Sequence, residues 1–183
     1  MKDGNAHPRP PRGHPGPAPG GPADAPPIRP LRVGLITAAI VAVADQITKY
    51  IVFVGIQPPP YGGLDVTSFL SLVSVMNRGV SFGLFSSGSP WAPFILTAIA
   101  ATVVAALTFW LRQAETRMLS ISLGMLIGGA IGNAIDRLVH GAVMDFVNLH
   151  WEGYHWPAFN VADAAITVGA VLMVLDALFV RKK

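Results

Sequence analysis

Four long apolar blocks dominate the chain, and polar or glycine-rich segments separate them. The blocks lie at residues 33–54, 91–111, 119–138 and 162–180. Each is close to the ~20 residues that an α-helix needs to cross ~30 Å of hydrocarbon. The pattern therefore predicts an all-α membrane protein with four transmembrane helices. The first block is too long for the apolar part of a cleaved signal peptide, so we expect it to be retained.

The segments between the first two blocks and between the last two blocks carry signals of their own. Residues 66–75, VTSFLSLVSV, are rich in β-branched and aromatic side chains and predict a β-strand. Gly79 and Gly83 follow this strand and indicate tight turns or close backbone approach. Aromatic residues typical of a membrane interface flank the segments: Trp91, Trp151, Tyr154 and Trp156.

The first thirty residues differ in composition from the rest of the chain. Residues 1–30 hold ten of the sixteen prolines and few bulky apolar side chains. Such a segment buries too little surface to offset its ordering entropy, so we predict a disordered, partly polyproline tail. It is either a plain cytoplasmic extension or a ligand for a proline-recognition module. Residues 31–183 then form a single membrane domain.

The distribution of basic residues predicts the orientation of the spans. Only 13% of the residues are charged, about half the ~25% typical of soluble proteins. Ten of the 13 basic residues fall on one side of a four-span layout: Lys2, Arg9, Arg12, Arg29, Arg32, Arg112, Arg117, Arg181, Lys182 and Lys183. Because basic loops stay in the cytoplasm, we expect both termini there and residues 55–90 and 139–161 outside. Topology accounts for the positive charge, so no nucleic-acid partner is expected.

Charged residues inside the apolar blocks need an explanation, because each costs on the order of 2.5–3.5 kcal/mol at the centre of a spanning helix. Asp45 and Lys49 lie four residues apart and share one helix face. They form either an ion pair that braces the bundle or a contact with a substrate. In the third block, Gly128 and Gly132 make a small-xxx-small face for close helix packing.

Three polar residues follow this glycine face one turn later. Asn133, Asp136 and Arg137 lie near the expected outer surface of the third span. Arg137 either extends to the lipid headgroups or pairs with Asp136. Alternatively, Asn133 shares a side with Asp136 and Arg137, and the three belong to a hydrogen-bond network that supports a site.

Asp145 and Asp163 are the strongest candidates for chemistry. Asp145 stands in an apolar segment beyond the third span, and Asp163 opens the fourth, so antiparallel spans bring both acids to one edge of the bilayer. Two carboxylates in a water-poor site share a proton, because one pKa rises. An ionised and a protonated carboxyl group are the equipment of aspartic hydrolysis. The alternative for Asp163 alone is an N-cap of the fourth helix.

Other chemistries have weaker support in the sequence. The chain has no cysteine, which excludes disulfides, thiolate metal sites and a cysteine nucleophile. His150 and His155 together with Asp145 are a possible metal site, but HWEGYH lacks the helical H-E-x-x-H spacing. Ser81 and Lys49 are a possible serine–lysine pair, although nothing in the sequence brings them together. We expect no metal.

Four stretches, in order, resemble the lipoprotein signal peptidases (signal peptidase II), a family of bacterial inner-membrane aspartic peptidases. They are DQITK at 45–49, NRGVSFG at 77–83, GNAIDRLVHGAVMDF at 132–146 and FNVADAAI at 159–166. Their places in the four-span layout match those of the family. The resemblance covers about residues 33–183, and the proline-rich tail lies outside it.

The resemblance implies a fold, a reaction and a location. The fold is a four-helix membrane bundle with a small periplasmic β-sheet cradle and a short periplasmic helix. The reaction is cleavage of prolipoproteins on the amino side of a diacylglyceryl-modified cysteine, with no metal or other cofactor. The enzyme is expected in the bacterial inner membrane, in contact with lipid, with its active site at the periplasmic face. Nothing requires more than a monomer.

The resemblance also implies roles for individual residues. Asp145 and Asp163 match the catalytic pair of the family, and Asp45 and Lys49 match its first-span pair. The positions that line or order the site are matched by Asn77, Gly79, Asn133, Arg137 and Asn160. Ser81 departs from the alanine that is common in the N-x-G-x-A-F motif of the family, which leaves the details of substrate packing open.

Two other classes of function fit parts of the sequence. A small proton-coupled transporter would use Asp45, Asp136, Asp145 and Asp163 as a relay. The acids of the outer segments cluster near one face, however, and no inverted repeat joins the two halves of the chain. The other alternative is a membrane scaffold that recruits a cytoplasmic partner through the proline-rich tail.

Overall fold

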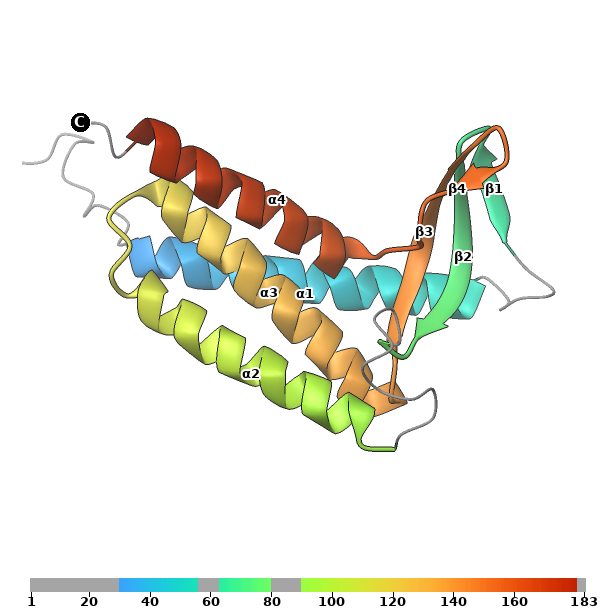
Figure 1. Ribbon diagram of the computed structural model, residues 1–183, viewed down its shortest axis with the longest axis horizontal. Coiled ribbons are helices and arrows are strands. Elements are labelled where there is room, and N and C mark those ends of the chain that lie inside the picture. Colours follow the sequence, from blue (N-terminus) through green and yellow to red (C-terminus); the bar gives the residue numbers. More distant parts are fainter. Residues whose placement is uncertain (1–29, 56–62, 80–89, 181–183) are drawn as a thin grey trace, which may run out of the picture.

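Four long helices form a bundle in the computed structural model, which describes residues 30–55, 63–79 and 90–180 (Figure 1). The helices are α1 (Pro30–Gly55), α2 (Ala92–Leu111), α3 (Arg117–His140) and α4 (Val161–Leu175), and α4 continues as a π-helical turn over Asp176–Val180. All four are long and apolar enough to cross a membrane. The prediction of four spanning helices is therefore confirmed. The first helix begins at Pro30, three residues earlier than predicted, and residues 1–29 of the predicted tail lie outside the described residues.

Helix α3 lies at the centre of the bundle and packs against each of the other three helices. Its glycines allow close approach on two sides. A Cβ atom on Gly128 would lie 2.5 Å from the carbonyl oxygen of Ala38 in α1, and one on Gly129 would lie 2.5 Å from that of Ala162 in α4. The predicted small-residue face is thus used for packing, and a second face of the same helix works in the same way.

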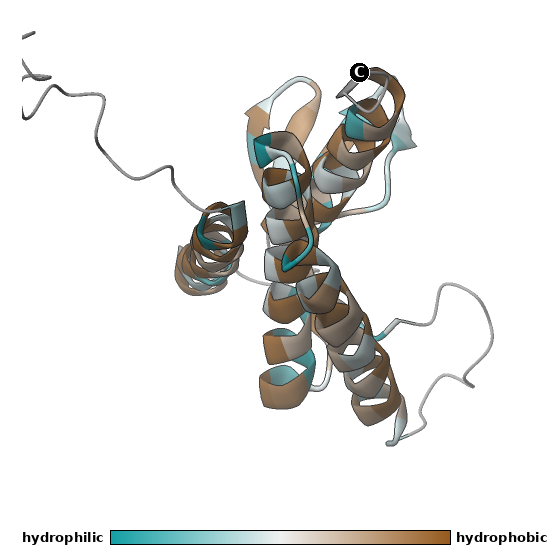
Figure 2. Ribbon diagram, turned by 90° about the vertical axis from the view of Figure 1, so that its left-hand side faces the viewer, coloured by the Kyte–Doolittle hydropathy of each residue, from teal (hydrophilic) through white to brown (hydrophobic). Residues whose placement is uncertain are grey.

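The outer faces of the helices are apolar (Figure 2). Large hydrophobic side chains such as Ile40, Phe53, Ile99 and Phe109 are each more than half exposed. A protein in water would bury such residues, whereas lipid tails cover them at no cost. Among the described residues, one cluster of buried hydrophobic side chains lies between the helices and consists of Ala38, Leu111, Leu119, Leu123 and Ile127.

An antiparallel sheet of four strands stands at one end of the bundle (Figure 1). Its order is β1 (Leu64–Thr67), β2 (Leu70–Asn77), β3 (Val143–Trp151) and β4 (Tyr154–His155). The prediction of one strand over 66–75 was wrong in its bounds, because the chain reverses at residues 68–69. The hydroxyl of Thr67 accepts a hydrogen bond from the backbone N–H of Phe69 (3.3 Å), which stabilises a turn inside the β-branched run.

Strand β3 connects the sheet to the helices. Gly141 ends α3 in the left-handed conformation (φ 70°), and this turn directs the chain from the helix into the strand. Met144 and Phe146 on β3 are buried against Val52 near the end of α1. The sheet is therefore fixed to the bundle at the strand that carries Asp145. The short helix implied by the resemblance is not among the described residues.

Candidate active site

The two predicted catalytic acids lie on neighbouring elements at the junction of sheet and bundle. Asp145 lies in β3, and Asp163 lies in the first turn of α4. The connecting segment returns along β3, because Phe159 exchanges backbone hydrogen bonds with Val147 (Val147 N to Phe159 O, 2.8 Å; Phe159 N to Val147 O, 3.1 Å). This pairing places the start of α4 beside Asp145.

Asn160 links the two acids. Its amide nitrogen Nδ2 donates to Asp145 Oδ1 (2.8 Å), and its oxygen Oδ1 accepts from the backbone N–H of Asp163 (2.9 Å). The backbone N–H of Asn160 donates in turn to Asp163 Oδ2 (3.3 Å). Asn160, not Asp163, is therefore the N-cap of α4, and Asp163 completes a capping box at the third helical position. The fully buried side chain of Asn160 thus holds the carboxylate of Asp145 and the backbone of Asp163.

Asn77 holds Asp145 from the side of the sheet. Its Nδ2 donates to Asp145 Oδ2 (3.0 Å), while its Oδ1 accepts from the backbone N–H of Gly79 (2.9 Å). Gly79 has a positive φ of 78°, and a Cβ atom there would lie 2.6 Å from Leu96. The glycine predicted at a tight turn therefore orients the amide of Asn77 toward Asp145.

Asn133 holds Asp163 from the side of the bundle. Its Nδ2 donates to Asp163 Oδ1 (2.8 Å), and its Oδ1 accepts from Lys49 Nζ (3.2 Å) and from Asn160 Nδ2 (3.2 Å). The amides of Asn77, Asn133 and Asn160 thus donate to three of the four carboxylate oxygens of the two acids. The hydrogen-bond network around Asn133, one of the alternatives from the sequence, is present.

Asp45 and Lys49 form a buried ion pair behind this network. Lys49 Nζ lies 2.7 Å from Asp45 Oδ2 and 2.8 Å from Asp136 Oδ2. Asp45 also accepts the backbone N–H of Ala162 at the start of α4 (2.9 Å). These contacts tie α1 to α3 and α4. The geometry is that of the bracing ion pair, and among the described residues Lys49 hydrogen-bonds Asn133 but neither Asp145 nor Asp163.

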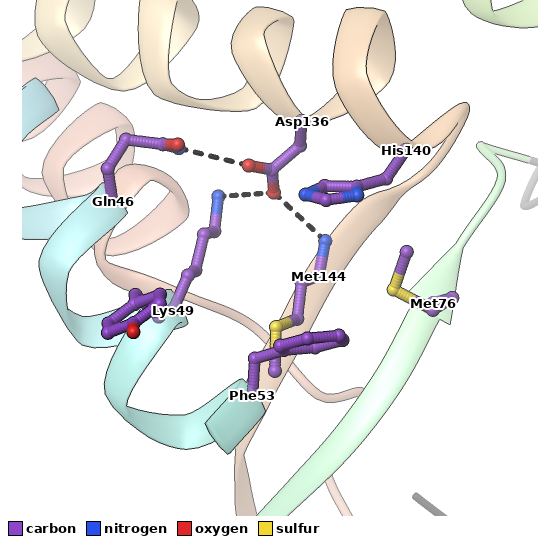
Figure 3. Close-up of a pocket in the computed structure, with 8 residues that line it drawn as sticks. Gln46, Lys49, Phe53, Met76, Asp136, His140 and Met144 are labelled. Atoms are coloured by element: carbon purple, nitrogen blue, oxygen red, sulfur yellow. Dashed lines mark hydrogen bonds and ion pairs between the residues drawn. The ribbon is translucent and has the colours of Figure 1, made fainter.

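Gln46 belongs to the network although the sequence analysis did not single it out, and its partner Asp136 was predicted there only as one alternative (Figure 3). Asp136 accepts hydrogen bonds from Gln46 Nε2 (2.9 Å) and from the backbone N–H of Met144 (3.0 Å). Both residues line a cavity of about 250 Å³ at the ends of α1 and α3, together with Lys49, Tyr50, Phe53, Met76, His140 and Met144. A signal for Gln46 was available in the sequence, because this amide residue lies next to the charged Asp45 within a spanning block.

Arg137 does not pair with Asp136, which corrects one of the alternatives. Asp136 pairs with Lys49, and among the described residues Arg137 forms no ion pair. Its guanidinium Nη1 donates to the backbone carbonyl of Asn133 (3.2 Å). Arg137 is half-buried and lies in the electrostatic field of Asp163, Asp136 and Asp145. Its charge therefore partly offsets that of the two acids.

The environment of Asp145 changes its protonation. Removal from water raises the pKa of its carboxyl group to about 6. The hydrogen bond from Asn77 lowers this pKa, the charge of Asp163 raises it, and the hydrogen bond from Asn160 and the charge of Lys49 lower it by smaller amounts. Burial and a neighbouring carboxylate thus act in the same direction, as expected for two acids that share a site. Asp145 keeps a proton over a wider pH range than an exposed aspartate does.

An open cleft lies beside Asp145. It has a volume of about 500 Å³, and its lining residues come from the end of β2 and from the segment before α4: Val75, Met76, Asn77, Arg78, Asp145, Pro157 and Ala158. This cleft has room for an extended peptide segment next to the buried carboxyl group. The arrangement is suited to hydrolysis of a peptide bond by two carboxyl groups and a water molecule.

The alternative chemistries have no matching geometry among the described residues. His150 and Asp145 lie five residues apart on strand β3, about 16 Å along the strand, which is too far for both to bind one ion. Within residues 30–55, 63–79 and 90–180, no three His, Asp or Glu side chains are placed to hold a metal ion. Ser81 and Gly83 lie outside these residues, so the proposed serine–lysine pair stays a prediction.

Comparison with known proteins gives the family. The sequence profile described as Signal peptidase (SPase) II matches residues 37–179. The chain belongs to this family. Its relatives include the lipoprotein signal peptidases of Rhodopseudomonas palustris, 42% identical over 153 residues that cover 81% of this chain and 93% of the relative, and of Burkholderia ambifaria, 46% identical over 141 residues that cover 76% and 83%.

Solved structures agree with this assignment. A bacterial membrane enzyme structure obtained by the in meso method at 1.9 Å resolution has a TM-score of 0.68 and 30% sequence identity, and the match covers 81% of this chain and 94% of that chain. A second one, at 2.3 Å resolution, has the same TM-score at 28% identity and covers 83% and 92%. The chain is thus a multi-pass membrane protease of the signal peptidase II family.

Proposed function

We propose that this protein is an aspartic endopeptidase that removes signal peptides from diacylglyceryl-modified prolipoproteins, cutting on the amino side of the lipidated cysteine. One observation carries the proposal. Asn160 joins Asp145 and Asp163 through its side chain, and Asp145 lines an open cleft of about 500 Å³. Membership of the signal peptidase II family supplies the substrate class.

The two acids have different roles in this mechanism. Asp163 takes a proton from the attacking water, whose oxygen adds to the carbonyl carbon of the scissile bond. Asp145 holds the shared proton and donates a hydrogen bond to the carbonyl oxygen as negative charge develops there. A proton then passes to the amide nitrogen as the C–N bond breaks. The raised pKa of Asp145 supports this division of roles.

Three asparagines keep the acids in place for this reaction. Asn77, Asn133 and Asn160 donate to the carboxylate oxygens, and this leaves Asp145 and Asp163 with few free rotamers. Lys49 and Asp45 support Asn133 from behind, and Gly79 orients Asn77. None of these contacts requires a cofactor, so we expect the activity to survive treatment with EDTA.

The position of the acids suits a substrate anchored in lipid. Each acyl methylene taken out of the membrane costs ~0.8 kcal/mol, so a soluble enzyme could not extract two acyl chains. Asp145 and Asp163 lie where the helices meet the sheet (Figure 1), and a bond at the membrane surface reaches them there. We place the junction of the helices and the sheet at the periplasmic face of the inner membrane, with both termini in the cytoplasm. We also infer that the protein is a monomer.

A gel-shift assay tests the proposal. Purified protein in detergent micelles is incubated with a diacylglyceryl-modified prolipoprotein, and loss of the signal peptide is followed by electrophoresis. We expect Asp145→Asn and Asp163→Asn to abolish cleavage while both variants still insert and fold. Asp65→Asn is the matched control, because Asp65 is an exposed acid on β1 and its variant should keep wild-type activity. Processing near the wild-type rate by either dyad variant would refute the mechanism.

A further inference from the structure

The β3–β4 hairpin forms the end of the sheet remote from α3 (Figure 1), and it carries two histidines. His150 on β3 and His155 on β4 are direct cross-strand partners. Their ring centres lie 5.3 Å apart, and the ring planes differ by 31°. Side chains at such positions project to the same face of the sheet, so the two imidazoles form a pair held by the backbone register.

Hydrogen bonds fix which nitrogen of His150 carries its proton. Ser71 Oγ donates to Asp65 Oδ1 (2.6 Å), and the same oxygen lies 2.8 Å from His150 Nε2. Because the single hydroxyl proton of Ser71 is used by the carboxylate, Oγ accepts from His150. His150 Nε2 is therefore protonated, and Nδ1 carries the lone pair of the neutral ring.

The ring of His155 is fixed in the same way by Asn148. The Nδ2 of Asn148 donates to the carbonyl oxygen of Trp156 (3.1 Å), which settles the orientation of the amide. Asn148 Oδ1 is then the acceptor that lies 3.0 Å from His155 Nδ1. His155 Nδ1 carries the proton, and Nε2 carries the lone pair. Each histidine thus has one nitrogen hydrogen-bonded to the sheet and one nitrogen that has no hydrogen bond within the described residues.

This arrangement is the one found around metal-binding histidines, whose second nitrogen donates to an oriented acceptor. The separation of the rings also fits. A Zn²⁺ ion about 2.0–2.1 Å from each ligating nitrogen lies about 3.2 Å from each ring centre. Ring centres 5.3 Å apart then subtend about 110° at the ion, which is close to the tetrahedral angle that Zn²⁺ adopts.

We propose that His150 and His155 form a binding site for a divalent transition-metal ion of the Zn²⁺ class. His150 Nδ1 and His155 Nε2 are the ligands, and water completes the coordination from a cavity of about 530 Å³. Aromatic side chains line this cavity beside the histidines: Phe69, Trp151, Tyr154 and Trp156. The ion clamps the two-residue strand β4 to β3. It takes no part in peptide hydrolysis, because His150 lies five residues, about 16 Å, along β3 from Asp145.

Zinc titration by isothermal calorimetry tests the site. The full-length protein carries His7→Asn and His14→Asn throughout, so that the histidines of the proline-rich tail do not contribute. We expect one saturable Zn²⁺ equivalent, lost in His150→Asn and in His155→Asn. Binding should weaken in acidic solution, because protonated imidazole is not a ligand. His140→Asn is the matched control, since His140 is an exposed histidine elsewhere in the structure, and it should bind Zn²⁺ like the parent protein.

A variant that leaves both ligands in place separates coordination from general damage to the sheet. Ser71→Ala removes the acceptor of the His150 proton, and we expect it to weaken Zn²⁺ binding by roughly 10–100-fold while the circular dichroism spectrum stays unchanged. His155 is exposed, so its variant decides the question if His150→Asn fails to fold. Unchanged Zn²⁺ binding in His155→Asn, or no saturable binding by the parent protein, would overturn the proposal.

Discussion

Replacing Lys49 with methionine tests whether the buried ion network holds the bundle together. Lys49 Nζ lies 2.7 Å from Asp45 Oδ2 and 2.8 Å from Asp136 Oδ2, and the two aspartates are 0% and 3% exposed. Methionine keeps the unbranched shape of lysine but removes the charge. Two buried carboxylates are then left without a cation between them.

The cost follows from the burial of these groups. Removing one partner of a buried ion pair costs about 3–5 kcal/mol, because the remaining charge stays desolvated. Lys49 serves two such pairs, so we expect Lys49→Met to lower the free energy of unfolding by at least about 3 kcal/mol. For a protein of this size, that corresponds to a fall in Tm of roughly 6–12 °C. Adding Asp136→Asn removes one stranded charge, and the double variant should be more stable than Lys49→Met alone.

Catalysis should fall as well, through a chain of hydrogen bonds. Lys49 Nζ donates to Asn133 Oδ1 (3.2 Å), and Asn133 Nδ2 donates to Asp163 Oδ1 (2.8 Å). Without Lys49, the amide of Asn133 can rotate away from Asp163. We expect kcat to fall about tenfold or more, equivalent to roughly 1.4 kcal/mol, at temperatures where the variant remains folded.

Thermal unfolding in detergent micelles, followed by near-ultraviolet circular dichroism, measures the loss of stability. Arg117→Met is the matched control, because Arg117 is exposed at the start of α3 and its loss should change stability by no more than about 0.5 kcal/mol. If Lys49→Met were as stable as this control, the carboxylates of Asp45 and Asp136 would need no cation. The ion network would then not be what joins α1 to α3 and α4.

Three further predictions concern packing and protonation. A Cβ atom on Gly132 would lie 2.5 Å from Asp45 Oδ2, so Gly132→Ala should lower the free energy of unfolding by about 1–3 kcal/mol, measured by thermal unfolding. Unchanged stability would show that α1 and α3 move apart at no cost to make room for the methyl group. The pKa of Asp145 is raised from 3.8 to about 6, so the folded wild-type protein loses stability as the pH rises through this range. Asp145→Asn should therefore gain stability relative to wild type between pH 4 and pH 6, and a pH-independent difference in Tm would contradict this. The Asn77 hydrogen bond lowers the pKa of Asp145, so Asn77→Ala should move the limb of kcat/KM that depends on Asp145 to higher pH, and a shift to lower pH would be inconsistent.

The spanning helices could be predicted from the sequence because lipid imposes a one-dimensional requirement. A helix that crosses hydrocarbon must be apolar along its whole length, so a continuous block identifies it without knowledge of its neighbours. The candidate acids could be found for the same reason, since a carboxylate among apolar residues is conspicuous. The chain reversal within residues 66–75 and the strand over residues 143–151 were not predicted. Val143, Met144, Asp145 and Phe146 are all buried, so this strand lacks the apolar–polar alternation that identifies one with an exposed face.

The partners of the polar residues were decided by the tertiary structure alone. The sequence offered Arg137 as a partner for Asp136, yet the packing of α1 against α3 gives Asp136 to Lys49, 87 positions away in the chain. The return of residues 159–160 along β3 likewise makes Asn160 the link between Asp145 and Asp163. The sequence by itself determined the number of spans and the kinds of reactive group. Which groups meet depended on backbone approach and strand register, because hydrogen bonds and ion pairs act over a few ångströms and residue spacing does not encode such contacts.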